Sequence, residues 1–126
     1  MDLDRPDVVA EVAAVFAAYE KALLVNDPDE IMSFFHDSPA TVRFGIADRQ
    51  TGWARQHAWR AAQPPLPPGR TLHDTLISTF GDGFAVVTAC FGYAGGQVTG
   101  RQSQTWVRLP EGWRIVHAHV SQLPVR

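Results

Sequence analysis

The residues best suited to chemistry are concentrated between positions 100 and 121. This segment reads GRQSQTWVRLPEGWRIVHAHVS and holds three arginines, two glutamines, two tryptophans and two histidines. The Pro-Glu-Gly sequence at its centre predicts a tight turn between two paired strands. A hairpin needs few polar side chains for its own stability, which indicates that one face of this pair meets a polar ligand.

His117 and His119 are the pair in this segment that could bind a metal ion. Two residues apart in a strand, they share a face, and imidazole is a ligand for zinc, copper and iron. A metal site needs at least a third ligand, and the other strands offer only Cys90 and Asp74. We therefore expect no metal, and we predict that His119 and Ser121 bind a ligand through hydrogen bonds. His117 could lie in the core, at an interface or at the rim of a pocket.

The strand expected over residues 98–109 has two polar faces. Alternation directs Arg101, Ser103 and Thr105 to one side. The opposite side receives Gln102, Gln104 and Trp106. The sequence leaves open which set lines a pocket, so Arg101 could bind a carboxylate or stabilise the hairpin or an interface.

Two further candidates lie in the first half of the chain. Tyr19 falls on the apolar stripe of a helix expected to begin at Asp4, so its ring is predicted to be buried. Its hydroxyl would bond to the backbone or face a cavity as a hydrogen-bond donor or general acid. Arg43 alternates with Val42 and Phe44 in a short strand, and is either a solvated edge residue or a clamp for a carboxylate.

The elements that would position these residues predict an α+β fold. Two more helices are expected, one capped by Asp27 with Ile31, Phe34 and Phe35 buried, and one over residues 52–63 that ends at Pro64. Trp53, His57 and Arg60 would share a face of the latter and could wall a cavity. After the strand at 41–46, four strands joined by tight turns are predicted at residues 71–80, 84–93, 98–109 and 113–123. This order predicts a curved antiparallel sheet covered by three helices, a cone with one open mouth.

Composition limits the class of protein. The 126 residues suffice for a single domain over residues 1–126, with 45% hydrophobic and 19% charged residues. The net charge of −2 offers no basic field for nucleic acid or an anionic membrane, and no apolar stretch reaches membrane-spanning length. The lone Cys90 suits a reducing compartment, so we expect a cytoplasmic location. No glycine-rich phosphate loop or nucleophile elbow occurs, and no cofactor is expected.

Several sequence runs resemble a known family. The order of helices and strands, ending in GWRIVHAHVS, resembles the nuclear transport factor 2-like (SnoaL-like, cystatin-like) superfamily. More narrowly, PDVVAEV near the start, TVRFG at residues 41–45, and GRQSQTWVRLPEGWRIV with the following AHVS resemble the AtzH-like family, which includes the oxalurate-catabolism HpxZ-like proteins. The GRQSQTWVRLPEGW run is the most specific of these.

The resemblance implies a function. It implies a dimer found beside amidases that degrade ureides and s-triazine ring products, and a cofactor-free decarboxylation of 1,3-dicarboxyurea to allophanate. The family's functional tyrosine and arginine fall on Tyr19 and Arg43. A substrate with two carboxylates favours a second cation, for which Arg101 is our candidate. The alternative function is a non-catalytic homodimer that binds a small carboxylate or supports a neighbouring amidase.

Overall fold

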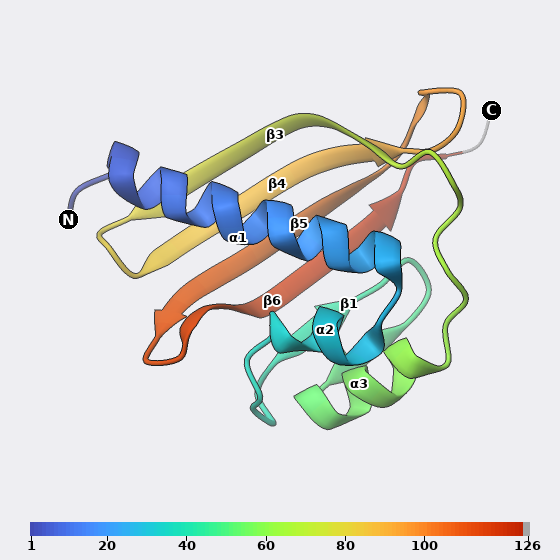
Figure 1. Ribbon diagram of the computed structural model, residues 1–126, viewed down its shortest axis with the longest axis horizontal. Coiled ribbons are helices and arrows are strands. Elements are labelled where there is room, and N and C mark those ends of the chain that lie inside the picture. Colours follow the sequence, from blue (N-terminus) through green and yellow to red (C-terminus); the bar gives the residue numbers. More distant parts are fainter. Residues whose placement is uncertain (125–126) are drawn as a thin grey trace.

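The computed structural model describes residues 1–124 as helices packed on one mixed sheet. The long helix α1 (Pro6–Val25) lies across one face of the sheet (Figure 1). The short helices α2 (Pro28–Ser33) and α3 (Trp53–Ala61) lie near the C-terminal end of α1. The predicted α+β fold with a curved sheet and three helices from the N-terminal half is confirmed. No helix of the described residues is long and apolar enough to cross a membrane.

The sheet has six strands in the order β2-β1-β6-β5-β4-β3. Its strands are β1 (Val42–Phe44), β2 (Arg49–Thr51), β3 (Thr71–Phe80), β4 (Phe84–Gly92), β5 (Val98–Leu109) and β6 (Gly112–Gln122). All neighbours pair antiparallel except β1 and β6, which run parallel. The predicted bounds of the four long strands agree with these to within about one residue, because alternation and glycine-containing turns mark both ends.

Two local predictions are corrected. Asp4 does not cap α1: Arg5 occupies the N-cap position, and no side chain caps the helix there. The Asp4 carboxylate instead accepts a hydrogen bond of 2.9 Å from the backbone N–H of Thr79, which ties the N-terminal segment to β3. The strand β2 was not predicted, because Arg49, Gln50 and Thr51 show no apolar alternation.

The core lies between α1 and the sheet face that the helix covers. One side of α1 is buried along its whole length, as the apolar stripe predicts. It meets alternate residues of the three central strands, among which Trp106 and Ile115 have no exposed surface. We call this covered face the inner face of the sheet and the opposite one the outer face.

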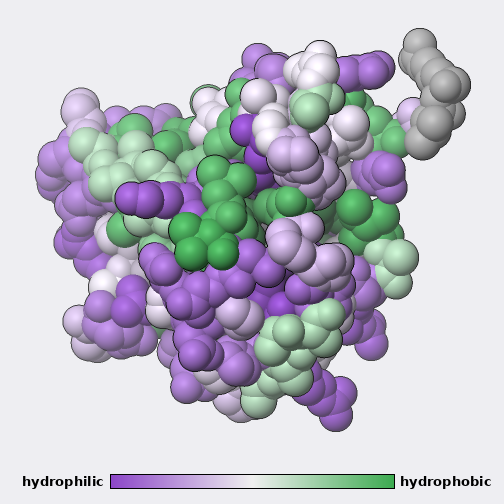
Figure 2. Space-filling view, turned by 45° about the vertical axis from the view of Figure 1, so that its right-hand side comes forward, coloured by the Kyte–Doolittle hydropathy of each residue, from purple (hydrophilic) through white to green (hydrophobic). Residues whose placement is uncertain are grey.

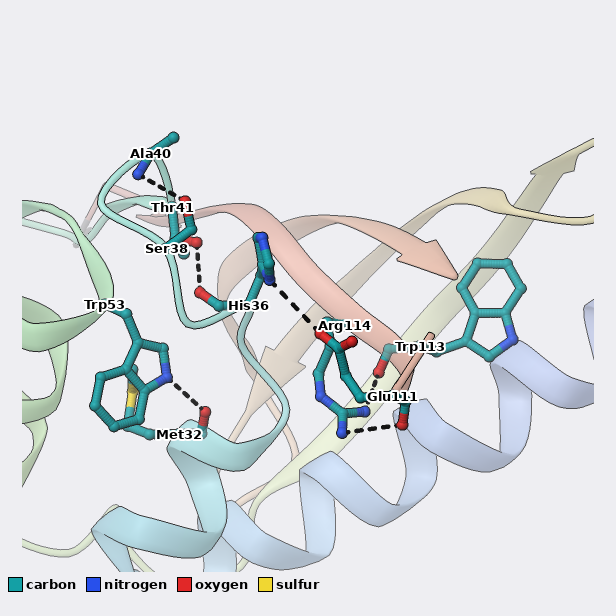
Figure 3. A network of polar contacts seen from close by, with 9 residues as sticks. All are labelled: Met32, His36, Ser38, Ala40, Thr41, Trp53, Glu111, Trp113 and Arg114. Carbon is teal, nitrogen blue, oxygen red and sulfur yellow. Dashed lines mark hydrogen bonds and ion pairs between the residues drawn. The ribbon is translucent and has the colours of Figure 1, made fainter. Parts of the chain in front are cut away.

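Hydrogen bonds to the backbone fix the segment between α2 and β1 (Figure 3). The indole N–H of Trp53 donates to the carbonyl of Met32 at 3.0 Å, and the Thr41 hydroxyl donates to the carbonyl of His36 at 2.6 Å. The backbone N–H of His36 donates to Ile115 of β6 at 2.9 Å. These bonds hold β1 in parallel register beside β6, and so fix the position of Arg43.

Asp27 caps α2 as the sequence predicts, since its carboxylate accepts hydrogen bonds from the backbone N–H groups of Asp29 and Glu30. We expect Asp27→Ala to lower the free energy of unfolding by about 1 kcal/mol, because the first turn loses its acceptor. Urea denaturation monitored by circular dichroism measures the change. Asp37→Ala, at an exposed position outside any helix, is the control, and an equal loss in both variants would contradict the capping role.

Candidate functional site

A cavity of about 410 Å³ lies between the inner face of the sheet, α1, α3 and the connector over residues 62–70. Apolar residues form much of its wall, including Leu23, Phe35 and the prolines of the connector. Three arginines from three different elements also line it: Arg43, Arg60 and Arg70. When the right-hand side of the view in Figure 1 is turned forward, hydrophobic residues lie at the centre of the surface among hydrophilic ones (Figure 2).

Tyr19 lines this cavity from α1. Its ring is buried and makes edge contacts with Phe34, Phe35 and Trp106, at centroid distances of 5.8, 5.9 and 6.4 Å. Burial raises the pKa of the phenol above its usual value of 10.0, although the charges of Arg60 and Arg43 act against this shift. The hydroxyl therefore keeps its proton at neutral pH and can act as a hydrogen-bond donor to a ligand.

Arg43 also points to the cavity. Its side chain is on the inner face and is only 7% exposed, while Val42 and Phe44 lie on the outer face. One terminal nitrogen, Nη1, donates to the Asp48 carboxylate at 2.6 Å and to the Gln50 amide oxygen at 3.1 Å. The sequence left open whether Arg43 was a solvated edge residue, and its burial excludes that alternative.

Asp48 is a site residue that sequence reasoning missed, because it lies in the turn between β1 and β2. Burial opposes its ionisation, but hydrogen bonding from Gln50 and the charge of Arg43 outweigh burial and lower the pKa of the carboxyl. A Cβ atom at Gly45 would collide with this carboxylate and lie 2.7 Å from Nη1 of Arg43. The glycine of the TVRFG run therefore provides the space in which the ion pair forms.

Arg70 belongs to a second, fully paired group at the start of β3. Its guanidinium donates to Glu20 at 2.8 and 3.3 Å, to Gln102 at 3.0 Å and to the hydroxyl of Tyr93 at 3.2 Å. The Gln102 amide also donates to Glu20 at 3.0 Å. Although burial opposes ionisation, the hydrogen bond and charge of Glu20 raise the pKa of Arg70. This group forms a charge-compensated part of the cavity wall.

Arg60 of α3 is the third cavity arginine, and it has no such compensation. It is only 8% exposed, and its Nε atom is buried without a hydrogen-bond partner. Among residues 1–124, no carboxylate lies within ion-pair distance of its guanidinium. Burial is the main reason that its pKa is lowered. The sequence predicted only that Arg60 could wall a cavity. The polar character of the helix face that it shares with Gln56 was a signal that it could bind a ligand.

The indole ring of Trp59 contacts both Arg43 and Arg60. The guanidinium carbon of Arg43 lies 4.0 Å from the centre of the Trp59 ring, and that of Arg60 lies 4.7 Å from it. Both distances fall within the range of cation–π contacts. Trp59 therefore holds two like charges beside one cavity.

The strand β5 directs Gln102, Gln104 and Trp106 to the inner face, which answers the question that alternation left open. The indole N–H of Trp106 donates to the amide oxygen of Gln104 at 3.0 Å. This bond occupies the oxygen and leaves the amide N–H groups of Gln104 as donors at the cavity wall.

The structure does not bring Arg101 or Ser121 into the cavity that Tyr19 and Arg43 line, whereas His119 borders both this cavity and a second hollow. Arg101, His119 and Ser121 border a separate hollow of about 460 Å³ on the outer face, together with His117 and Asp74. The His119 ring lies 5.5 Å from that of Phe44 on this outer face, although the residue also borders the main cavity. Arg60 and Arg70, rather than Arg101, are the cations that accompany Arg43. Within residues 1–124, no three His, Cys, Asp or Glu side chains are grouped as a metal site requires.

The fold and its cavity define a protein of the nuclear transport factor 2-like superfamily. A superfamily member from Salmonella enterica is 27% identical over 96% of this chain and 94% of its own, with a TM-score of 0.71. The AtzH-like family model matches residues 1–125, so the chain belongs to the AtzH-like family. No curated protein matches the chain.

Two solved structures are much more similar. A cystatin-like fold protein from Burkholderia xenovorans LB400 is 44% identical, with a TM-score of 0.93 over 100% of this chain and 99% of that one. A protein of unknown function from the DUF3225 family of Pectobacterium atrosepticum is 42% identical, with a TM-score of 0.91 over 98% and 96%. The resemblance seen in the sequence is therefore confirmed at the level of family and fold.

The buried ion pair between Glu20 and Arg70 predicts a large effect on stability. Their side chains are only 13% and 6% exposed. Glu20→Gln would leave the Arg70 charge without its counter-ion, so we expect the free energy of unfolding to fall by roughly 3–5 kcal/mol. Denaturant unfolding measures this loss. Glu30→Gln, an exposed change on α2, is the matched control, and a similar small effect in both variants would contradict the role of the pair.

Proposed function

We propose that the protein is a cofactor-free carboxy-lyase of ureide catabolism that removes carbon dioxide from a small N-carboxylated urea, such as 1,3-dicarboxyurea, in the cytoplasm. The observation that carries this proposal is the excess of buried positive charge at the cavity. Three arginines line it, and the two carboxylates that pair with them belong to Asp48 and Glu20. A ligand carboxylate would compensate the remaining charge, because an unpaired buried ion is costly.

Several hydrogen-bond donors line the cavity. The phenol of Tyr19, the guanidinium groups of Arg43 and Arg60 and the amide N–H groups of Gln104 lie at one wall or another of the same space. Arginine suits carboxylates because its planar fork can form two parallel hydrogen bonds. A small planar anion with several carboxylate or carbonyl oxygens fits this set of donors.

The proposed chemistry uses these donors and a proton. When a carbamate loses carbon dioxide, the bond between nitrogen and the carboxylate carbon breaks and its electron pair stays on nitrogen. The urea nitrogen then takes up one proton, and carbon dioxide leaves as a neutral molecule. A donor placed at this nitrogen stabilises the developing charge.

Tyr19 is the residue suited to that role. Its raised pKa keeps the phenol protonated throughout the neutral range. The nitrogen of a departing urea anion is far more basic than a phenolate, so the proton moves favourably as the bond breaks. Water then returns a proton to the phenolate, and Arg43 stabilises the phenolate while it exists, since its charge acts on the Tyr19 side chain.

Decarboxylation is tested with dicarboxyurea generated enzymatically and added to the pure protein. We expect release of carbon dioxide well above the uncatalysed rate, and we expect Tyr19→Phe to lower kcat by roughly 10²–10⁴-fold, since it removes only the proton donor. Arg43→Ala should also reduce turnover. Thermal unfolding controls for folding, because phenylalanine fills the same space against Phe34, Phe35 and Trp106. Absence of release above background would exclude this activity.

A second candidate function is a non-catalytic homodimer that binds a small carboxylate in the same cavity or supports a neighbouring amidase. The outer face of the sheet favours a dimer. Exposed apolar side chains lie there, including Leu76 and Phe84, and no helix of residues 1–124 covers them. Arg101 and Asp74 border one hollow on this face, so two copies related by a twofold axis could pair each arginine with the other copy's aspartate.

Native mass spectrometry tests the second candidate. A dimer through the outer face predicts twice the chain mass of 13.9 kDa, and Arg101→Asp should weaken it by placing like charges opposite each other. Arg55→Asp, at an exposed site on α3, is the control for charge alone. An amidase encoded nearby should co-purify if the protein is an accessory subunit. A monomer in every condition would contradict the dimer.

A further inference from the structure

Arg60 differs from the other two cavity arginines in what surrounds it. Arg70 is bonded to Glu20, Gln102 and Tyr93, and Arg43 is bonded to Asp48 and Gln50. Arg60 has the ring of Trp59 on one side but no hydrogen-bonded counter-ion among residues 1–124, and its Nε atom is buried without a partner. A buried guanidinium of this kind is a binding group for an anion.

A second residue on the same helix face has the same property. Gln56 lies one turn before Arg60 and is completely buried, and neither its amide oxygen nor its amide nitrogen has a hydrogen-bond partner within the described residues. Buried polar groups without partners are rare in folded proteins. The buried face of α3 therefore has unused hydrogen-bonding capacity, and of its two residues Arg60 lines the cavity.

We propose that Arg60 is the specificity-determining residue of the cavity: it binds the carboxylate that the ligand retains, while the carboxylate that is lost lies beside Tyr19 and Arg43. This assignment rests on the proposed decarboxylation. The assignment follows from the difference in charge compensation between Arg43 and Arg60. Asp48 offsets the charge of Arg43, whereas Arg60 keeps its full charge for the ligand.

The roles of Arg60 and Arg43 follow from the principle that an enzyme accelerates a reaction only through contacts that are stronger in the transition state than in the substrate complex. A strong contact to the leaving carboxylate would stabilise the substrate more than the transition state, because that group loses its charge as carbon dioxide forms. A strong contact to the retained carboxylate stabilises both equally, and so lowers KM without raising the barrier. The uncompensated cation is therefore suited to the retained carboxylate.

Trp59 acts as the positioning residue for this arrangement. It contacts both guanidinium groups, whose central carbons lie 4.0 and 4.7 Å from the ring centre, so the two positive charges lie close together. The charge of Arg43 also disfavours that of Arg60. An anion with two carboxylates relieves this repulsion better than one with a single carboxylate.

The first test separates binding from chemistry in the kinetics of dicarboxyurea decarboxylation. We expect Arg60→Met to raise KM roughly 10–100-fold while kcat changes only a few-fold, since a charged hydrogen-bond pair is lost from both states. Arg60→Lys should recover part of the affinity because it keeps the charge but not the planar fork. Arg55→Gln, an exposed change on the same helix, should behave as wild type. A fall in kcat with unchanged KM in Arg60→Met would overturn the assignment.

The second test does not require turnover. Calorimetry with glutarate, which has two carboxylates, and butyrate, which has one, should show at least about tenfold tighter binding of glutarate to the wild type and no such preference in Arg60→Met. Without ligand, Arg60→Met should unfold at a higher temperature, because it removes an uncompensated buried charge; a merely structural arginine would give the opposite shift. A preference for glutarate that persists in Arg60→Met, or none in the wild type, would overturn the inference whatever the decarboxylation assay shows.

Discussion

The burial of three guanidinium groups against one face of a single sheet is the constraint on which the rest of the structure depends. Each charge taken out of water needs compensation, and the chain supplies it for Arg70 and Arg43 from different elements but supplies none for Arg60 among residues 1–124. The compensation for Arg70 comes from α1, β5 and Tyr93, the residue after β4, and that for Arg43 comes from the β1–β2 hairpin. The position of α1 across the sheet is therefore tied to the site as well as to the apolar core.

The packing beneath Arg70 shows how core and site depend on each other. The guanidinium lies 4.8 Å from the centre of the Phe91 ring, and this ring occupies space that a Cβ atom at position 100 would take. The same Cβ would also lie 2.6 Å from the carbonyl oxygen of Ser121. Gly100 thus allows β4, β5 and β6 to approach closely at the place where the Phe91 ring packs against Arg70. A glycine in β5 is therefore needed for the charged group of Arg70, which lies two strands away.

Sequence reasoning succeeded where the determinants are local. Strand bounds, the Asp27 cap and the alternation that isolates Arg43 from Val42 and Phe44 all depend on neighbours in the chain. It failed where the determinant is distant: Asp4 bonds to Thr79, and Arg70 pairs with a glutamate 50 residues earlier. Alternation correctly separated the two sets of residues in β5, but only the packing of α1 decides which set is covered, and so Arg101 was favoured over Arg60 and Arg70.

Burial has opposite effects on the two residues at the centre of the cavity. It raises the pKa of Tyr19, so that the phenol stays neutral and keeps a proton to donate. It lowers the pKa of Arg60, because the guanidinium loses hydration that no carboxylate of residues 1–124 replaces. Both effects come from the removal of water around the charged form of each group, in a cavity that Leu23, Phe35 and the connector prolines also line. A carboxylate ligand that enters this space replaces the hydration that Arg60 lost on burial. Its basic atoms also accept a hydrogen bond from the phenol of Tyr19, which burial keeps protonated.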